Sequence, residues 1–483
     1  MTLPRGWASA TIADVTAINP KHPVDADRGQ SVSFVPMPAV DEHLGAIVDR
    51  IDKTLDEIWT GYTHFADGDV IFAKITPCME NGKAAVASGL TNGLACGSTE
   101  FYVFRPEGGV DAHYLWRFLR QESFRVEAEN HMTGAVGQRR VPRSYLESHG
   151  LPLPPSSEQR RIAAKLDALT ARIARARADL DRVPLLAEKL RQSVVKDAFS
   201  GRLTEEFRRN SPLKAQCDEG LEELFAQKTG SKRKKPAVAI DWRPELVIPD
   251  EWRWVSVDRV IAAAQYGSSS KTNDNSDGVP VLRMGNIQSG ELDFSNLKYL
   301  PSGHYEFPAL LLSEGDVLFN RTNSFELVGK SAVFRGASKP MSFASYLIRL
   351  QCSGILPDLL VRYLNSPIGR SWIESVASQQ VGQANVNGTK LRSLGIPLPP
   401  PGEQVEMKRQ IDLAFARAGR LEAEATRARK LVDRLESAIL VKAFRGELVP
   451  QDPNDEPASV LLERIRAERA AGPKAKRGRR AAS

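Results

Sequence analysis

A chain of 483 residues is too long for one ordinary hydrophobic core, and with 42% hydrophobic and 26% charged residues it is too apolar for a disordered protein. Its formal charge of +7 comes from two basic runs, at 232–235 and 474–480, and the remainder of the chain carries only about −2. The charge therefore identifies no nucleic-acid-binding face in the folded part, and no apolar run approaches the roughly 20 residues that a membrane-spanning helix needs.

The beginning of the chain and its cysteines predict a cytoplasmic protein. The first residues, MTLPRGW, lack the charged and then apolar layout of a signal peptide. The cysteines are isolated, with no C-x-x-C pair and no disulfide framework. They are Cys78, Cys96, Cys217 and Cys352.

Residues 1–152 are expected to form a first domain of mixed α and β structure. Short apolar segments at 69–73 and 101–104 are bounded by Gly, Asn and Pro, which is typical of strands. Aromatic and leucine spacing predicts one amphipathic helix over 113–127. The order of the strands in a sheet does not follow from the pattern.

A long helix is predicted over 153–202. Ser156 and the acidic and amide residues after it form a fair helix start, and the following apolar residues alternate at spacings of four and three over more than four heptads. Pro184 interrupts this pattern, because a proline removes one backbone hydrogen bond, and we expect a kink or short break near Val183.

The rest of the chain repeats this unit at an offset of 245 residues. After a polar, Lys-rich linker over 203–245, which surrounds a short helical stretch, the string GLPLPPSSEQ at 150–159 returns as GIPLPPPGEQ at 395–404. The string AFSG at 198–201 likewise returns as AFRG at 443–446. A tandem duplication therefore predicts a second domain over 246–397, a second long helix over 398–446 and a C-terminal tail over 447–483. The fold class is α+β.

Both helices carry an apolar seam of 3.5-residue period, which suits a partner helix. We expect the two helices to pair as an antiparallel coiled coil; the alternative is that each packs only on its own domain. The main seam residues are Ile162, Leu166, Leu169, Ile173, Leu180, Leu190, Ile411, Leu421, Val432 and Leu435.

The sequence contains no recognisable catalytic, metal or cofactor site. Gly329-Lys-Ser lacks the earlier glycine of a phosphate-binding loop, and no G-x-G-x-x-G occurs. Pro249-Asp250 is followed by no acidic-x-Lys at a spacing that suits a magnesium nuclease. The seven histidines form neither H-x-x-x-H nor H-E-x-x-H, so we expect scattered surface or hydrogen-bonded histidines and no zinc.

The repeated GLPLPPxxEQ and AF-x-G strings that begin and end each helix resemble the specificity subunits of type I restriction–modification systems, as do the tail AFRGELVPQDPNDEPA at 443–458 and the segments AKITPCMENGK and GDVLFNRTN. This resemblance implies that each mixed domain reads one half of a bipartite DNA target and that the helices set the gap. It also implies a non-catalytic chain that docks two methyltransferase subunits and restriction subunits, with the methyl donor, ATP and magnesium bound by those partners. Half-sites about one helical turn apart lie roughly 34 Å from one another, which a rigid helical rod can span.

Candidate DNA-binding residues are polar or basic groups in the loops of the two domains, because base edges are read by hydrogen-bonding side chains. In the first domain they are Lys74, Thr76, Asn81, Lys83, Gln138, Arg139 and Arg140. In the second they are Arg283, Asn286, Asn320, Arg321, Asn323, Lys330, Gln383, Asn385, Asn387 and Lys390. Lys74 and Arg321 occupy matching places in the repeat, as do Gln138 and Gln383.

Two other classes of function stay open. One is a single-chain restriction or modification enzyme with a degenerate active site, which would modify or cut DNA without partners. The other is a coiled-coil scaffold whose isolated domains ignore DNA.

Overall fold

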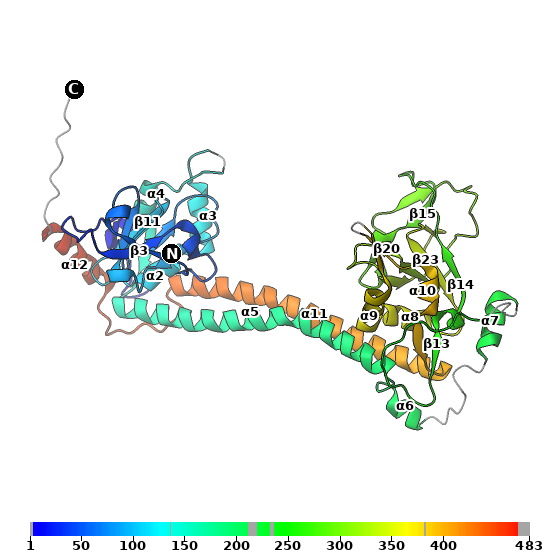
Figure 1. Ribbon diagram of the computed structural model, residues 1–483. Helices are drawn as coiled ribbons and strands as arrows, with labels where there is room; N and C mark the ends of the chain where they lie inside the picture. Colours follow the sequence, from blue (N-terminus) through cyan, green and yellow to red (C-terminus); the bar gives the residue numbers. More distant parts are fainter. Residues whose placement is uncertain (1–2, 136, 211–219, 232–235, 381–382, 472–483) are drawn as a thin grey trace. The chain divides into compact units, whose positions relative to one another are not determined.

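The computed structural model describes residues 3–135, 137–210, 220–231, 236–380 and 383–471. The chain divides into two compact units, one formed by Met1–Asp181 with Thr426–Ser483 and the other by Arg182–Ala425. Each unit combines one mixed domain with parts of both long helices, so the fold is α+β (Figure 1).

The strands of the first unit are β1 (Ala8–Thr11), β2 (Thr16–Ile18), β3 (Ser31–Val35), β4 (Val40–Asp41), β5 (Ala46–Ile47), β6 (Ile51–Thr54), β7 (Thr63–Ala66), β8 (Val70–Ala73), β9 (Ala84–Val86), β10 (Leu94–Gly97), β11 (Phe101–Pro106) and β12 (Gly150–Leu153). They form two four-stranded sheets, β6-β3-β10-β7 and β2-β11-β8-β9, with the pairs β1-β12 and β4-β5 beside them. The strands expected at 69–73 and 101–104 are confirmed as β8 and β11.

The helices of the first domain are α1 (Ile12–Val15), α2 (Ala112–Leu119), α3 (Glu122–Asn130) and α4 (Arg143–Ser148), with 3-10 turns η1 (Met37–Ala39), η2 (Asp56–Ile58) and η3 (Thr91–Gly93). The prediction of one helix over 113–127 is wrong, because the chain turns between α2 and α3. There the side-chain amide of Gln121 donates a hydrogen bond to the carbonyl of Phe118 at 3.3 Å, which satisfies a carbonyl at the end of α2.

The strands of the second unit are β13 (Arg253–Ser256), β14 (Ile261–Tyr266), β15 (Val279–Leu282), β16 (Ile287–Gln288), β17 (Glu291–Leu292), β18 (Lys298–Leu300), β19 (Asp316–Asn320), β20 (Thr322–Asn323), β21 (Ser331–Val333), β22 (Ser342–Phe343), β23 (Leu347–Cys352), β24 (Ser378–Gln380), β25 (Gln383–Asn385) and β26 (Gly395–Leu398). The central sheet has the order β14-β23-β19-β21, and β13 pairs with β26 as β1 pairs with β12. The other sheets are β18-β15-β22, β20-β25-β24 and β16-β17.

The helices of the second unit are α6 (Glu205–Asn210), α7 (Leu221–Thr229), α8 (Pro357–Leu364), α9 (Pro367–Val376) and α10 (Gly388–Ser393), with 3-10 turns η4 (Val257–Val260) and η5 (Met284–Asn286). The short helix expected within the linker is confirmed as α7. It does not lie free, because Leu221 is buried and belongs to the core of this unit.

The long helices are α5 (Ser156–Phe199) and α11 (Pro401–Phe444), and they run antiparallel. In the first unit Arg177 lies 2.6 Å from Asp433, and Arg429 lies 2.6 Å from Asp181. From Arg177 to Asp181 the residue number rises along α5, while the number of the paired residue on α11 falls from 433 to 429, so the helices are antiparallel. In the second unit, Arg191 of α5 contacts Glu422 of α11 at 2.6 Å.

The predicted seam is buried only in part. Ile162, Leu166, Ile173 and Ile411 are buried, whereas Leu169, Leu180 and Val432 are partly exposed. Leu190, Leu421 and Leu435 are 41–53% exposed. Two helices cover only one narrow stripe of each other, and in the middle of the pair small side chains occupy it. These are Ala187, Ala418 and Ala425, all buried.

The break expected near Val183 is wrong, since α5 continues through Pro184 as one helix. A proline removes a single backbone hydrogen bond, and the turns on both sides of it are held by pairing with α11. Asp181 on one side bonds Arg429, and Arg191 on the other bonds Glu422. A bend of α5 at Pro184, without a break in the helix, stays a prediction.

Segments from both ends of the chain close the core of the first unit. The core cluster of the first domain includes Ile162 from the start of α5, Phe444 from the end of α11 and Leu461 from α12 (Ala458–Ala471). At the end of α11, Gly446 adopts a left-handed conformation (φ 74°), and a Cβ there would lie 2.5 Å from the ring of Pro4. The repeated glycine thus ends the helix and permits close packing on the N-terminal segment.

The second unit is closed in the same way by the end of α5. Phe199 is buried in its core, and Gly201 has a φ of 77°, with Pro249 2.3 Å from the position that a Cβ on Gly201 would take.

Among the described residues, no helix has the length and apolar character needed to cross a bilayer.

Candidate nucleic-acid interface

In the first domain two predicted loops meet beyond the end of β8. The amide of Val141 donates to the carbonyl of Lys74 at 2.9 Å, and the amide of Thr76 donates to the carbonyl of Arg139 at 3.0 Å. Ile75 and Arg140 form an antiparallel bridge. We call the segments 74–83 and 133–141 the two-loop site of the first domain.

The second domain builds the same site from 321–330 and 383–387. The amide of Val386 donates to the carbonyl of Arg321 at 2.9 Å. This hydrogen bond is the equivalent, in the second repeat, of the bond from Val141 to Lys74. Thr322 of β20 pairs with Asn385 of β25, as Ile75 pairs with Arg140. The two-loop site is therefore a duplicated framework on which different side chains are mounted.

Most cations of the first site are already paired within the domain. Arg140 donates two hydrogen bonds to Glu100, at 2.9 and 2.8 Å, and these bonds lower the pKa of the Glu100 carboxyl. The ammonium of Lys74 donates to the carbonyl of Thr99 at 2.6 Å and lies 5.3 Å from the ring of Tyr102. These contacts fix the side chains in orientation but leave them at the surface.

Glu80 connects the two loops of this site. It accepts a hydrogen bond from the Thr76 hydroxyl at 2.9 Å and lies 3.5 Å from Arg139, which is also 3.3 Å from Glu129. Gln138 is exposed, and no hydrogen bond of its side chain appears among the described residues. It is the polar side chain of this site with the most freedom to contact a ligand.

Lys83 and Asn81 belong to the segment 74–83, but their side chains lie away from the contacts between the two loops. The ammonium of Lys83 donates to the carbonyl of Val40 at 2.9 Å and lies 3.3 Å from Glu42, so it anchors the turn around η1. Asn81 is exposed at the edge of a hollow of about 960 Å³ beside α2, α3 and α11.

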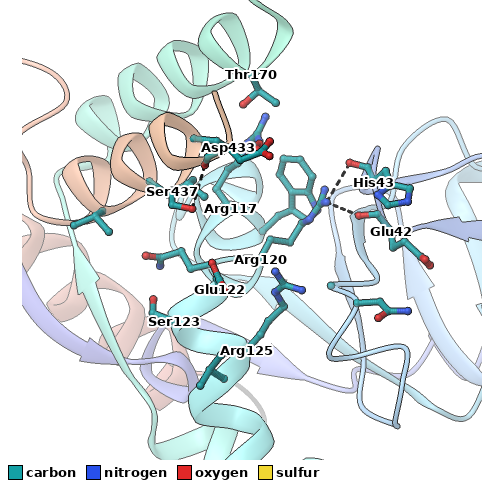
Figure 2. Close-up of a pocket in the computed structure, with 18 of the residues that line it drawn as sticks. Glu42, His43, Arg117, Arg120, Glu122, Ser123, Arg125, Thr170, Asp433 and Ser437 are labelled. Atoms are coloured by element: carbon teal, nitrogen blue, oxygen red, sulfur yellow. Dashed lines mark hydrogen bonds between the residues drawn. The ribbon is translucent and has the colours of Figure 1, made fainter. Parts of the chain in front are cut away.

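Figure 2 shows this hollow, in which Arg120 donates to the carbonyls of Glu42 at 2.6 Å and His43 at 3.2 Å. Burial lowers the pKa of Arg120 to about 10. A hollow of about 410 Å³ lies in the second unit beside α8, α9 and α5, and it is lined by the repeat counterparts Arg362 and Arg370 of Arg117 and Arg125. The duplication has thus preserved the hollow together with the two-loop site.

In the second domain Arg283, Asn323 and Lys330 line one cavity of about 440 Å³. Arg321 lies apart from it, donates to the side-chain oxygen of Asn385 at 3.2 Å and lies 5.0 Å from the ring of Tyr266. The second domain therefore presents two groups of candidates: one lines the cavity and includes Asn323 and Lys330 of the two-loop site, and the other is formed by Arg321 and Asn385.

Four candidates of the second domain hold its own backbone. The side chain of Asn286 donates to the carbonyl of Asp293 at 2.8 Å, and that of Asn320 donates to the carbonyl of Leu327 at 3.2 Å. Asn387 caps α10 by accepting from the amide of Lys390, whose ammonium donates to the carbonyl of Val376 at 2.6 Å. Gln383 belongs to β25, and its neighbours Val381 and Gly382 lie outside the described residues.

Sequence reasoning missed two arginines that hold one loop of each two-loop site. The guanidinium of Arg125 in α3 donates to the carbonyl of Glu80, and that of Arg370 in α9 donates to the carbonyl of Phe325 at 2.7 Å. The two arginines are 245 residues apart, which is the offset of the repeat. Their recurrence at this offset is the sequence feature from which they could have been predicted.

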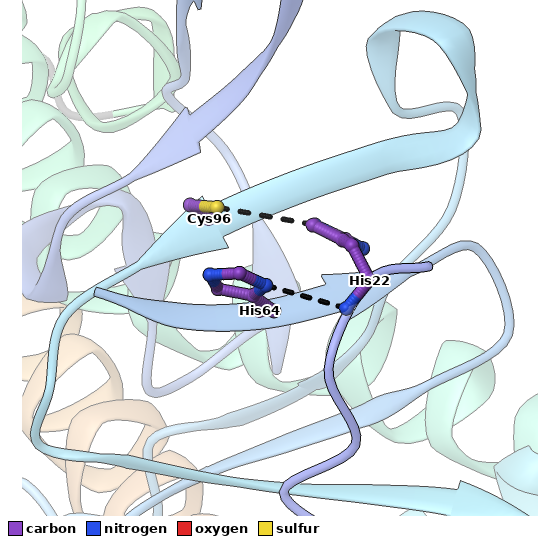
Figure 3. Close-up of side chains that lie close together, drawn as sticks. All are labelled: His22, His64 and Cys96. Carbon is purple, nitrogen blue, oxygen red and sulfur yellow. Dashed lines mark hydrogen bonds between the residues drawn. The ribbon is translucent and has the colours of Figure 1, made fainter. Parts of the chain in front are cut away.

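A buried cluster of His22, His64 and Cys96 brings three possible metal ligands within 4.8 Å of one another (Figure 3). Burial lowers the pKa of both histidines and raises the pKa of the Cys96 thiol to about 11. Nε2 of His22 bonds the carbonyl of Ala95 at 2.9 Å and Nε2 of His64 bonds that of Trp59 at 2.8 Å, while Nδ1 of His64 accepts from the His22 amide.

The geometry of this cluster suits a hydrogen-bonded core better than a metal site. The histidine rings stack at 4.6 Å with 27° between their planes, and a nitrogen lone pair lies in the plane of its ring. Stacked rings direct their lone pairs side by side instead of toward one ion. We therefore assign these residues to the core of the sheet β6-β3-β10-β7.

Comparison with known proteins shows to which family the chain belongs. A family model described as "Type I restriction modification DNA specificity domain" matches residues 60–182 and 249–416, which together make up more than half of the chain.

Relatives and solved structures agree with this match. The chain is 29% identical to the type I restriction enzyme EcoEI specificity subunit of Escherichia coli, over 91% of this chain and 83% of that protein, and 27% identical to the EcoKI specificity subunit of strain K12, over 98% of both. The crystal structure of the HsdS subunit from Thermoanaerobacter tengcongensis has the same fold, with a TM-score of 0.65, 22% identity, and coverage of 93% of this chain and 99% of that one. The chain therefore belongs to the family of type I restriction–modification specificity subunits, the non-catalytic part of these complexes, and it carries two DNA specificity domains.

Proposed function

We propose that the chain reads a bipartite DNA target, with one half-site recognised by the two-loop site of each domain. The observation that carries this proposal is the duplicated framework. The bonds of Val141 to Lys74 and of Val386 to Arg321 are the same, whereas the side chains mounted beside them differ. Bases are read by side chains. Two domains that share the same backbone framework but differ in their exposed side chains can therefore recognise two different half-sites.

The two long helices would set the gap between the half-sites. Each has 44 residues, which corresponds to about 66 Å at 1.5 Å per residue. Support comes from the ion pairs of Arg177 with Asp433 and of Arg191 with Glu422. Their antiparallel contacts stiffen the pair, and only a stiff spacer can define a gap.

The duplication also supports two equivalent docking places for methyltransferase subunits. Leu186 and Leu190 are 59% and 41% exposed on α5, and their repeat counterparts Leu431 and Leu435 are 62% and 53% exposed on α11. Leucines four residues apart share one helix face and form an apolar patch that a partner can cover. Restriction subunits would join this core in the cytoplasm, and the methyl donor, ATP and magnesium would be bound by the partner subunits.

The test is methylation mapping in cells that carry the complete complex. Wild-type complex should modify one bipartite motif, and Arg321→Ala should change the preference in one half-site while Lys74→Ala changes it in the other. A continuous motif, or a preference that neither substitution alters, would contradict the proposal.

Purified chain given magnesium and a methyl donor should neither modify nor cut DNA. Activity of the chain alone would favour the single-chain enzyme instead, and isolated chain that ignores DNA at moderate salt would favour a scaffold.

A further inference from the structure

The cavity of the second domain, which we call the donor pocket, is defined by Arg283, Met284, Gln288, Asn323, Lys330 and Tyr346 and has a volume of about 440 Å³. Its walls come from three separate parts of the chain, namely η5 with the start of β16, the segment around β20, and the loop before β23. None of the described residues that line it is acidic, although two of them are cationic. An acid-free concavity with two cations favours a ligand that presents hydrogen-bond acceptors.

The donors of this pocket are only partly used within the protein. The Arg283 guanidinium reaches the backbone carbonyl of Asn296 at 3.2 Å, while its Nε is buried and has no hydrogen-bond partner among the described residues. The ammonium of Lys330 forms no ion pair or hydrogen bond with any described residue. The Lys330 ammonium is thus the donor at this pocket that has no partner among the described residues, and a ligand that accepts its hydrogen bond would satisfy it.

In the first domain the lysine equivalent to Lys330 is already neutralised. Lys83 corresponds to Lys330 in the repeated Gly-Lys string, and Met37 of η1 corresponds to Met284 of η5. Lys83 lies 3.3 Å from Glu42 and donates to the carbonyl of Val40. Pro36, which carries no side-chain donor, stands where the second domain has Arg283.

We propose that the donor pocket of the second domain binds the major-groove edge of a guanine, so that the half-site read by this domain contains a guanine that the first domain has no means to read in this way. This inference rests on the proposed function. A guanine edge presents two acceptors, O6 and N7, and arginine and lysine are its usual partners.

A base edge fits this pocket better than a backbone phosphate. Phosphates are held by surface groups that follow the strand, whereas Arg283 is fixed between β15 and the carbonyl of Asn296. Tyr346 and Met284 are 47% and 36% exposed at the pocket and offer apolar surface to a neighbouring base.

The experiment uses the complete complex with the motif obtained by selection from random duplexes. Each guanine of the second half-site is replaced in turn by 7-deazaguanine, which lacks N7, and by hypoxanthine, which keeps O6 and N7. At one position the 7-deazaguanine should weaken binding by about 5- to 140-fold, and hypoxanthine there should not.

Arg283→Gln and Lys330→Gln should abolish this discrimination and leave the first half-site unchanged. Lys339→Gln, which removes an exposed cation of the same domain outside the pocket, is the matched control. Arg283→Lys, with circular dichroism of every variant, separates a loss of reading from a loss of folding, because it keeps the charge.

Three results would overturn the inference: a second half-site without guanine, no position sensitive to 7-deazaguanine, or variants that weaken all sequences equally, which is the behaviour of a phosphate contact. A wild-type complex that selects no motif would overturn the proposed function itself, so the two failures are distinguishable.

Discussion

The indole nitrogen of Trp7 donates a hydrogen bond to Oε2 of the buried carboxylate of Glu158 at 3.0 Å. The repeat reproduces this bond between Trp252 and Glu403 at 2.9 Å. In both units the carboxylate lies in the first turn of a long helix, where the helix dipole favours negative charge. The Glu of the repeated GLPLPPxxEQ string thus connects the helix start to the N-terminal segment of its own domain.

The glutamine of the same string makes a second repeated connection. Gln159 accepts from the amide of Asp111 at 2.8 Å and donates to the carbonyl of Pro154 at 2.8 Å. Gln404 accepts from the amide of Leu356 at 3.0 Å and donates to the carbonyl of Pro399 at 3.1 Å. Since Asp111 and Leu356 precede α2 and α8, the string fastens the start of each long helix to the domain before it.

We expect the two buried glutamates to respond differently to neutralisation. Burial raises the pKa of Glu158, so its contribution to stability is fully present below its unfolded pKa and is lost as pH rises through its folded pKa. Glu158→Gln removes this titration, and its thermal stability relative to wild type should therefore improve between pH 4.5 and pH 8, as measured by scanning calorimetry. A constant difference across that range would contradict this.

Glu403→Gln should destabilise the second unit instead. Glu403 accepts a bond from the Thr204 hydroxyl at 2.6 Å and pairs with Arg208, whose side chain is only 16% exposed. Removing one partner of a buried ion pair typically costs about 3 kcal/mol, because the other charge stays buried without compensation. Hydrogen exchange should become faster around the start of α11, while Glu158→Gln serves as the matched substitution in the other unit.

Arg125 and Arg370 should each control the selectivity of one half-site without contacting DNA. Arg125→Gln frees the carbonyl of Glu80, and a hydrogen bond from a charged group is worth roughly 1.5–3 kcal/mol, which is enough to loosen the loop. Methylation mapping should show a relaxed preference in one half-site for Arg125→Gln and in the other for Arg370→Gln. Arg125→Lys should restore part of the preference, and relaxation of both half-sites by either variant would exclude this role.

Longer helices should change the gap and leave the half-sites alone. Seven residues inserted after Ala176 and seven after Asp433 keep the heptad phase and add about 10 Å to the helix pair. The gap in the mapped motif should grow by about three base pairs at 3.4 Å each. Altered bases in either half-site would refute the role of the helices as a spacer.

The exposed leucine pairs should each account for one methyltransferase subunit. Replacing Leu186 and Leu190 with Gln should lower the partner number from two to one in native mass spectrometry, and so should replacing Leu431 and Leu435. Combining the four changes should leave no bound methyltransferase.

Val24 and Val247, which are 87% and 89% exposed outside the helices, provide the control substitutions for this experiment. An unchanged partner number in the four-leucine variant would remove these pairs from the interface.

The local and repetitive features of this chain were predictable from the sequence. The spacing of apolar residues from Ser156 onward led to α5, and the offset of 245 then led to α11, since helix formation depends on neighbours in the chain. The two loops of the candidate site were predicted as well, because Lys74 and Arg321 follow the same repeated strand.

The roles of individual side chains within those loops were not predictable. Asn286, Asn320 and Lys83 look like reading groups in the sequence, yet their partners are Asp293, Leu327 and Val40, which only the fold brings within reach. Conversely, Arg125 and Arg370 look like ordinary helix residues in the sequence, and only the fold shows that they hold the loops.

The sequence by itself thus determined the duplication, the two helices and the absence of catalytic motifs, because each is encoded in residue type at short or constant spacing. Only the tertiary structure decided that Leu461 and Phe444 complete the core of the N-terminal domain, and which cations keep free donors. Both depend on contacts between residues that are not neighbours in the sequence. Leu461 and Phe444 lie hundreds of positions from the core that they complete, and Lys83 lies beside Glu42 whereas Lys330 has no counterpart to that carboxylate.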